Sequence, residues 1–143
     1  MSIVNCPGCD IACAVISYKG FDHVALVTKR LPEMVKFYKE GLGLSIEHEG
    51  VAKAGYKVVT LGAGAAILDL CEATPTNPAP NANLTEGHFC LVANGTSIYE
   101  VIGALKRVGL TPLPAEVTPG AEGKSLSTFL RDPDGNLVEI KVY

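Results

Sequence analysis

The 143-residue sequence lacks several features that mark large classes of protein. It has no apolar run approaching the roughly 20 residues of a membrane-spanning helix, so we expect no membrane partner. It has no basic excess, since 12 Lys and Arg stand against 15 Asp and Glu, and the net charge of −3 argues against nucleic acid or an anionic membrane as partner. Its first six residues lack the basic and apolar regions of a secretory signal, so we expect a cytoplasmic protein.

The five cysteines do not form an even set, which fits reduced thiols in a cytoplasm better than a disulfide framework. Cys6, Cys9 and Cys13 gather in residues 1–20, which we interpret as a leader with a possible extra strand over 11–18. A structural zinc site needs four ligands, and no second cysteine pair follows at zinc-ribbon spacing. We therefore favour a tail with free thiols over a metal or redox site in this leader.

The rest of the chain, residues 21–143, reads as one globular domain built from two similar halves. Each half has the predicted order β-α-β-β-β, with module one over 21–73, a linker rich in Pro and Asn over 74–85, and module two over 86–143. We expect strands at 21–27, 44–49, 56–61, 66–71, 87–93, 110–117, 126–131 and 137–142, and helices over 31–42 and from the capping box at 97–100 to Gly109. The predicted fold class is therefore α+β.

Four polar residues occupy corresponding places in the two halves. His23 and His88 open the first strand of each half, and Asp69 and Glu139 lie in the last strand of each half. Strand alternation places these side chains on the face opposite the bulky apolar residues, with small neighbours such as Ala25 beside them. A single such residue is usually a core histidine or a solvated acid, but four at matching positions favour one shared site.

Two imidazoles with one or two carboxylates suit a divalent metal ion. Nitrogen and oxygen ligands of this kind fit Zn, Ni, Fe(II) or Mn, and the residue types alone do not choose among them. The sequence therefore predicts a metal site that takes ligands from both halves.

Four motifs together resemble the glyoxalase/bleomycin-resistance/dioxygenase superfamily, also described as the vicinal oxygen chelate fold. They are Asp22-His-Val-Ala-Leu-Val27, Phe37-Tyr38 followed by Gly41-Leu-Gly-Leu44, Gly87-His-Phe-Cys-Leu91 and Phe129-Leu-Arg-Asp-Pro-Asp-Gly-Asn-Leu-Val-Glu139. The resemblance covers residues 21–143 and is greatest to small glyoxalase-domain proteins. It implies paired βαβββ modules whose sheets curl into an open, barrel-like cup with the helices outside.

The resemblance implies His23, His88 and Glu139 as metal ligands, with Asp69 at the place of a fourth ligand that is usually Glu. Because Asp is shorter, a triad of two His and one carboxylate with water in the open positions is the alternative. The implied activity is that of a metal-dependent lyase or isomerase acting on a small α-oxo compound or its thiol adduct. Glu139 or Asp69 would be the base, and a homodimer is the expected assembly.

Other functions within the resemblance stay open. A fosfomycin-type thiol transferase would need basic residues for a phosphonate, for which Lys124 and Arg131 are candidates, although both types are more often surface charges. An extradiol-type dioxygenase would want Fe(II) and a further histidine, and His48 lies on a strand that we expect to be exposed. A drug-binding protein of the bleomycin-resistance kind is disfavoured by the absence of Trp and by 6% aromatic residues. The loop 119–124 is a candidate lid, although an ordinary hairpin connection is the simpler interpretation.

Overall fold

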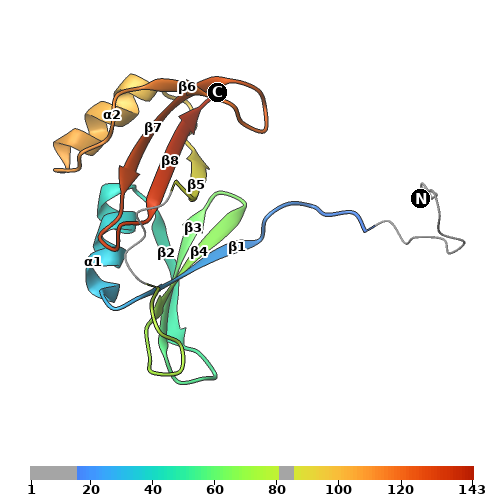
Figure 1. Cartoon of the computed structure of the whole chain (residues 1–143), viewed down its shortest axis with the longest axis vertical. Helices are drawn as coiled ribbons and strands as arrows, with labels where there is room; N and C mark the ends of the chain where they lie inside the picture. The colour runs from blue at the N-terminus through green and yellow to red at the C-terminus, as the bar shows by residue number, and fades with distance from the viewer. Residues whose placement is uncertain (1–15, 81–85) are drawn as a thin grey trace, which may run out of the picture.

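Two four-stranded sheets, one from each half of the chain, form the framework of the protein (Figure 1). The computed structural model describes residues 16–80 and 86–143. The first half contains β1 (His23–Thr28), α1 (Leu31–Lys36), the π-helical turn η1 (Phe37–Gly41), β2 (Ser45–Val51), β3 (Lys57–Ala63) and β4 (Ala66–Glu72). The second half contains β5 (His88–Val92), α2 (Ile98–Arg107), β6 (Glu116–Thr118), β7 (Ser125–Arg131) and β8 (Leu137–Val142). The predicted repeat and the α+β class are both confirmed.

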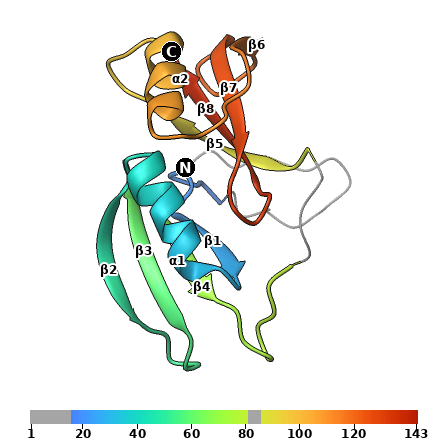
Figure 2. The same cartoon turned by 90° about the vertical axis from the view of Figure 1, so that its left-hand side faces the viewer.

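Both sheets have the same topology, in which the first strand of the half pairs in parallel with the last. The strand orders are β1-β4-β3-β2 and β5-β8-β7-β6. In this register Ala25 lies opposite Asp69, and Cys90 lies opposite Glu139, so each histidine comes two residues before the residue that faces the acid of its own half. The sheets do not close into a barrel within the chain, and each leaves one face open (Figure 2).

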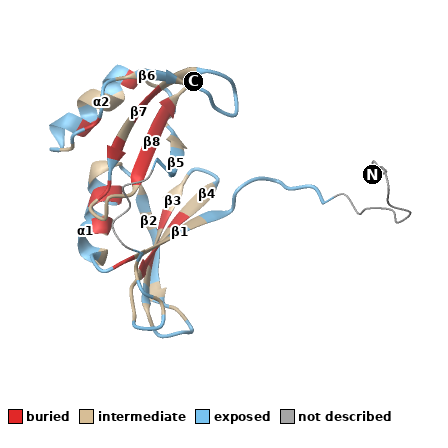
Figure 3. Cartoon of the chain, in the orientation of Figure 1, coloured by how far each residue is buried: buried red, intermediate tan, exposed pale blue. Residues whose placement is uncertain are grey.

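The opposite face of each sheet is buried in a core that both halves share. Leu68 and Leu70 alternate with Asp69 on β4, and Val138 and Ile140 flank Glu139 on β8; all four apolar side chains belong to this core. Met34 and Tyr38, carried by α1 and η1, are fully buried against them. Figure 3 shows this buried band running along β8 and the α1 region. The alternation predicted from the sequence therefore explains which face of each sheet is left open.

The turn between β7 and β8 ties the two halves together. The Tyr38 hydroxyl donates to Asp132 Oδ2 at 2.7 Å, and Arg30 donates to the carbonyl oxygen of Pro133 at 3.3 Å. Asp132 Oδ1 also accepts the backbone N–H groups of Asp134 and Asn136. The turn closes at Gly135, which has φ +86°, a conformation that glycine adopts without strain. Asp132 therefore fixes both the turn and its contact with the first half.

Two elements differ clearly from the prediction. The expected strand over 110–117 is wrong except at its end, since only Glu116–Thr118 pairs in β6. Pro112 and Pro114 explain the loss, because proline has no N–H to donate to a ladder. The helix over 31–42 ends its α-helical part at Lys36 and continues as the wider turn η1, in which Leu42 N–H donates to the Phe37 carbonyl.

The leader falls mostly outside the described residues. Cys6, Cys9 and Cys13 lie there, and of the possible strand over 11–18 only residues 16–18 are described, with no strand assigned. No helix in the described part of the chain is long and apolar enough to cross a membrane.

Candidate functional site

His23 and Asp69 occupy the open face of the first sheet. His23 Nδ1 lies 2.7 Å from Asp22 Oδ1, and about half of the His23 side chain is exposed. The hydrogen bond to Asp22, together with the charges of Asp22 and Asp69, raises the pKa of His23 above its usual range despite some desolvation. Asp69 is half-buried and its Oδ1 accepts the Thr60 hydroxyl at 2.5 Å. With Nδ1 held by Asp22, the Nε2 atom of His23 is left for another partner.

His88 and Glu139 are in direct contact on the open face of the second sheet. His88 Nδ1 lies 2.8 Å from the carbonyl oxygen of Glu86, and His88 Nε2 lies 3.0 Å from Glu139 Oε2. A carbonyl can only accept, so Nδ1 carries a proton, and Nε2 then faces a carboxylate. That arrangement requires either a second ring proton or a cation at Nε2.

Glu139 is buried, and its second carboxylate oxygen, Oε1, has partners other than His88. Thr118 donates to Oε1 at 2.7 Å, and the Lys141 ammonium nitrogen lies 3.6 Å from the same atom. Burial alone would raise the pKa of Glu139. Hydrogen bonds from Ser127, Thr118 and His88 and the charge of Lys141 outweigh burial, so the pKa of Glu139 is lowered. The carboxylate is therefore kept ionised, with Oε2 directed at His88.

Two thiols accompany the acids. Cys90 lies opposite Glu139 on β5, and desolvation of its sulfur together with the charge of Glu139 raises the pKa of its thiol to about 11. Cys71 is buried two residues after Asp69, and burial and the charge of Asp69 also raise its pKa. Both thiols are therefore protonated at neutral pH, which makes them poor nucleophiles.

The structure brings the four predicted ligands together in pairs and not as a set. His88 and Glu139 touch, and His23 lies close enough to Asp69 for the charge of the acid to act on it. Over residues 16–80 and 86–143, no group of three or more His, Cys, Asp or Glu is arranged to hold a metal ion. Each module thus supplies one imidazole and one carboxylate, which is half of the predicted ligand set.

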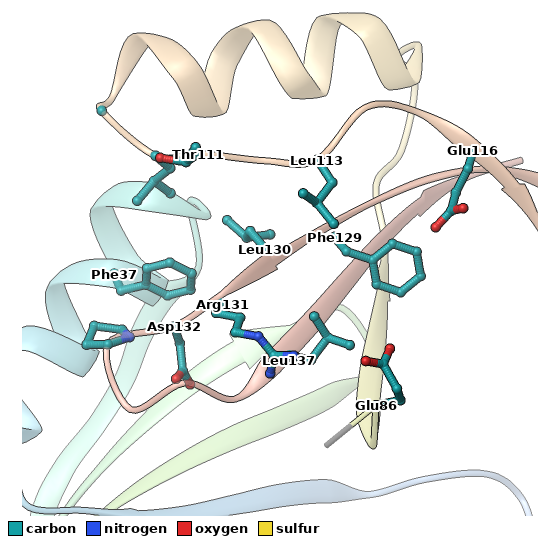
Figure 4. Close-up of a pocket in the computed structure, with 13 residues that line it drawn as sticks. Phe37, Glu86, Thr111, Leu113, Glu116, Phe129, Leu130, Arg131, Asp132 and Leu137 are labelled. Carbon is teal, nitrogen blue, oxygen red and sulfur yellow. The ribbon is translucent and has the colours of Figure 1, made fainter. Parts of the chain in front are cut away.

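A cavity of about 660 Å³ (Figure 4) neighbours the His88 pair, although none of the four predicted ligands lines it. Its wall includes Phe129, whose ring meets the His88 ring edge-to-face at 5.5 Å between centroids, and Leu137, which lies opposite His88 in the sheet. Glu86, the backbone acceptor of His88, lines it as well. A volume of this size suits a small molecule, and its walls are mainly apolar.

The weaker candidates for site residues differ in where they lie relative to the cavity. Arg131 lines the cavity and donates to the carbonyl oxygen of Gly135 at 2.9 Å. Lys124 and His48 are exposed, and neither lines this cavity.

The loop 119–124 is held to the sheet by the end of β8. Its Glu122 N–H donates to the Tyr143 hydroxyl at 3.1 Å. At Gly120, an added Cβ would come within 2.9 Å of Lys141 Cε, so the loop backbone packs directly on that side chain. These contacts agree with a hairpin connection that covers Lys141.

Sequence reasoning did not single out Lys141, Thr118 or Ser127 as parts of the site. Lys141 could have been found, because it shares a strand face with Glu139 and a charged residue at that position needs a partner. Thr118 and Ser127 carry no such signal, since hydroxyl residues are common on strands.

Comparison with known proteins places the chain among similar folds. The family model described as "Glyoxalase/Bleomycin resistance protein/Dioxygenase superfamily" matches residues 20–140. Virulence protein STM3117 of Salmonella typhimurium is 31% identical over 124 residues, covering 85% of this chain and 83% of that protein. Its crystal structure superposes with a TM-score of 0.70 over 90% of this chain and 99% of that one.

Two further structures share the fold at lower identity. Lactoylglutathione lyase from Agrobacterium tumefaciens is 24% identical with a TM-score of 0.59, covering 88% of this chain and 95% of that chain. TnmS3, an antibiotic binding protein from Streptomyces sp. CB03234, is 17% identical with a TM-score of 0.67, covering 90% and 98%. At these identities the likeness concerns the fold alone.

Proposed function

Because the chain belongs to the glyoxalase/bleomycin resistance protein/dioxygenase superfamily, we propose that it is a metal-dependent lyase or isomerase of glyoxalase type. The substrate class is a small α-oxo compound or its thiol adduct. The ligands are His23 and Asp69 from one module and His88 and Glu139 from another. Zn, Ni, Fe(II) and Mn all suit this mixture of nitrogen and oxygen donors.

The surroundings of His88 carry this proposal. Its Nδ1 donates to a backbone carbonyl, and its Nε2 faces a carboxylate oxygen at 3.0 Å. A histidine that ligates a metal typically donates its other ring N–H to an oxygen acceptor in this manner. His23, with Nδ1 on Asp22, repeats the pattern in the first module. The donor set therefore fits a divalent ion that would take the place of the proton between His88 and Glu139.

The residues divide the chemistry between them. A bound divalent ion supplies a Lewis acid that lowers the energy of negative charge developing on two adjacent substrate oxygens. Glu139 has a lowered pKa and one oxygen already hydrogen-bonded, so it serves as a fixed ligand better than as a proton acceptor. Asp69, which has a hydroxyl partner in Thr60, is then the better candidate for the base that removes the proton beside the carbonyl.

Two chains are needed to complete such a site. A single chain leaves the open faces of both sheets uncovered, and its described residues assemble no three-ligand group. In a two-fold dimer the first module of one chain would face the second module of its partner, and each dimer would contain two identical sites. The proposal is thus a homodimer whose sites are shared between subunits.

Complementation tests the shared site directly. His23→Ala and His88→Ala each remove one imidazole from every site, so each purified variant should lose bound metal and activity with methylglyoxal and a small thiol. When both variants are co-expressed, a mixed dimer has one site with both histidines and one with neither. Random pairing then restores about a quarter of the wild-type sites.

The outcomes separate the parts of the proposal. Wild-type protein that takes up none of the four metals would refute the metal-dependent function. Metal uptake by wild-type protein without any recovery in the mixed dimers would refute the shared site and leave the metal in place.

The alternative is a protein that sequesters a small molecule. The apolar cavity of about 660 Å³ beside His88 favours it, because binding there requires no metal. A ligand held equally tightly by wild-type protein and by His88→Ala protein stripped with a chelator would support sequestration, whereas turnover that depends on added metal supports the enzyme.

A further inference from the structure

Lys141 is a buried cation in the wall of the candidate site. Its side chain is 2% exposed, and its ammonium nitrogen lies 3.6 Å from Glu139 Oε1. The same nitrogen donates to the carbonyl oxygen of Thr118 at 3.0 Å and to the Thr118 hydroxyl, and it lies 3.5 Å from the carbonyl oxygen of Ser125. Burying an ammonium group is costly unless oxygen acceptors surround it, and oxygen atoms of Thr118, Ser125 and Glu139 surround this one.

The ammonium group cannot swing out to touch a ligand. The loop 119–124 lies over the side chain, with Gly120 packed against the Lys141 stem, and the Tyr143 ring lies 5.7 Å from the nitrogen. Lys141 therefore acts on the open face through its charge alone. Its enclosure keeps that charge poorly screened by solvent, because salt and water screen buried charges much less than exposed ones.

The charge of Lys141 changes the net charge of a metal-loaded site. The two carboxylates would neutralise the charge of a divalent ion, because the two imidazoles are neutral. Lys141 adds one positive charge directly behind Glu139. Asp22, beside His23, has a side chain that is 90% exposed, so solvent screens its opposing charge. Glu86 and Glu116, which line the neighbouring cavity, are exposed and screened in the same way, so Lys141 adds one poorly screened positive charge to the charge of the ligand set.

We propose that Lys141 adapts the site to a negatively charged substrate, such as an α-oxo carboxylate or an anionic thiol adduct. The inference rests on the proposed function and narrows its substrate class. A cation placed beside the ligand oxygens favours an anion on arrival, and it also stabilises the negative charge that forms when the substrate loses a proton. The same charge repels the metal ion, so Lys141 lowers metal affinity while it raises the affinity for anions.

Two variants remove the charge in different ways. Lys141→Gln keeps a hydrogen-bond donor toward Thr118, and Lys141→Met keeps an unbranched stem under Gly120. The matched control is Lys106→Met on α2, which removes the same charge from an exposed position. Circular dichroism and dimer size identify the variants that keep the wild-type fold.

The measurement uses full-length protein loaded with Mn²⁺. Electron paramagnetic resonance of free Mn²⁺ gives the metal affinity, and water proton relaxation follows displacement of metal-bound water by oxalate, a dianion, or by oxamide, its uncharged analogue. We expect both Lys141 variants to bind Mn²⁺ more tightly and oxalate more weakly, each by about tenfold, the order expected for removing one unit charge from behind the ligands at an effective dielectric constant of about 20. Oxamide binding and the Lys106→Met protein should match wild type.

The opposite results are equally clear. If oxalate affinity is unchanged in a folded Lys141 variant, or if oxamide affinity falls as much as oxalate affinity, the charge argument is wrong and the metal-dependent function stands. If wild-type protein binds no Mn²⁺, Zn²⁺, Ni²⁺ or Fe²⁺, the proposed function fails and this inference fails with it.

Discussion

Replacing Tyr38 with Phe removes the buried one of the hydrogen bonds that join the two modules. Tyr38 is fully buried and Asp132 is 5% exposed, so the lost hydroxyl cannot be replaced by bulk water. Asp132 Oδ2 would keep the Asn136 side-chain donor at 2.9 Å. A hydrogen bond to a charged group contributes about 1.5–3 kcal/mol, so we expect Tyr38→Phe to lower the free energy of unfolding by about 2 kcal/mol.

The size of the chain converts this loss into a measurable shift. For a domain of this length, about 2 kcal/mol corresponds to a fall in Tm of roughly 6 °C at neutral pH. The matched control is Tyr99→Phe, because the Tyr99 side chain is 67% exposed and its hydroxyl is free to bond with water. Both variants are melted at one protein concentration, since association would make Tm depend on concentration.

Alkaline pH gives a second readout with a definite sign. Burial first, and the charge of Asp132 next, raise the pKa of Tyr38 above its usual value of 10.0. A raised pKa means that this contribution to stability is complete below pH 10 and is lost as pH rises above it. The difference in Tm between wild-type and Tyr38→Phe protein should therefore shrink above pH 10. Equal Tm values at pH 7 would show that the Tyr38–Asp132 contact does not stabilise the fold, and a difference that stays constant to pH 11 would show that the pKa of Tyr38 is not raised.

Three further changes probe separate sites. In metal-free protein the lowered pKa of Glu139 contributes stability above the ordinary pKa of 4.5, and this contribution is lost as pH falls. Glu139→Gln should therefore flatten the decline in the urea midpoint between pH 6 and 3. A decline equal to that of wild-type protein would contradict this. Asp22→Asn should lower the pKa of His23 in an NMR titration, and an unaltered curve would remove Asp22 as the cause. Ser97→Ala breaks the capping box of α2 and should reduce the free energy of unfolding by about 1 kcal/mol in a denaturant titration, whereas no loss would mean that the cap is unimportant.

The sequence predicted the repeat well because each module carries a strong local pattern. Strand alternation around Asp69 and Glu139 placed both acids opposite the core, and the buried neighbours Leu68 and Val138 confirm that face. The strand predicted over 110–117 is wrong except at its end, because its prolines have no N–H to donate to a ladder even though Leu110 and Leu113 fit a strand pattern.

Other features were beyond local patterns. The switch from α1 to η1 at Phe37 depends on burying both Phe37 and Tyr38 against the second module, which is a tertiary requirement. The relative placement of the modules could not be predicted either. The open face of one module could form a site with the second module of the same chain or with that of a partner chain. The predicted ligands therefore stand in pairs, and whether four meet at one ion remains a prediction.

The parallel pairing of first and last strands has a consequence for biosynthesis. His88 and Glu139 are 51 residues apart in sequence, so their contact can form only after both β5 and β8 have been synthesised. Closing so long a loop loses chain entropy that only the finished sheet can offset. A chain that lacks β8 consequently lacks both the carboxylate that contacts His88 and the lysine behind it, so neither charge acts on the open face until β8 has paired.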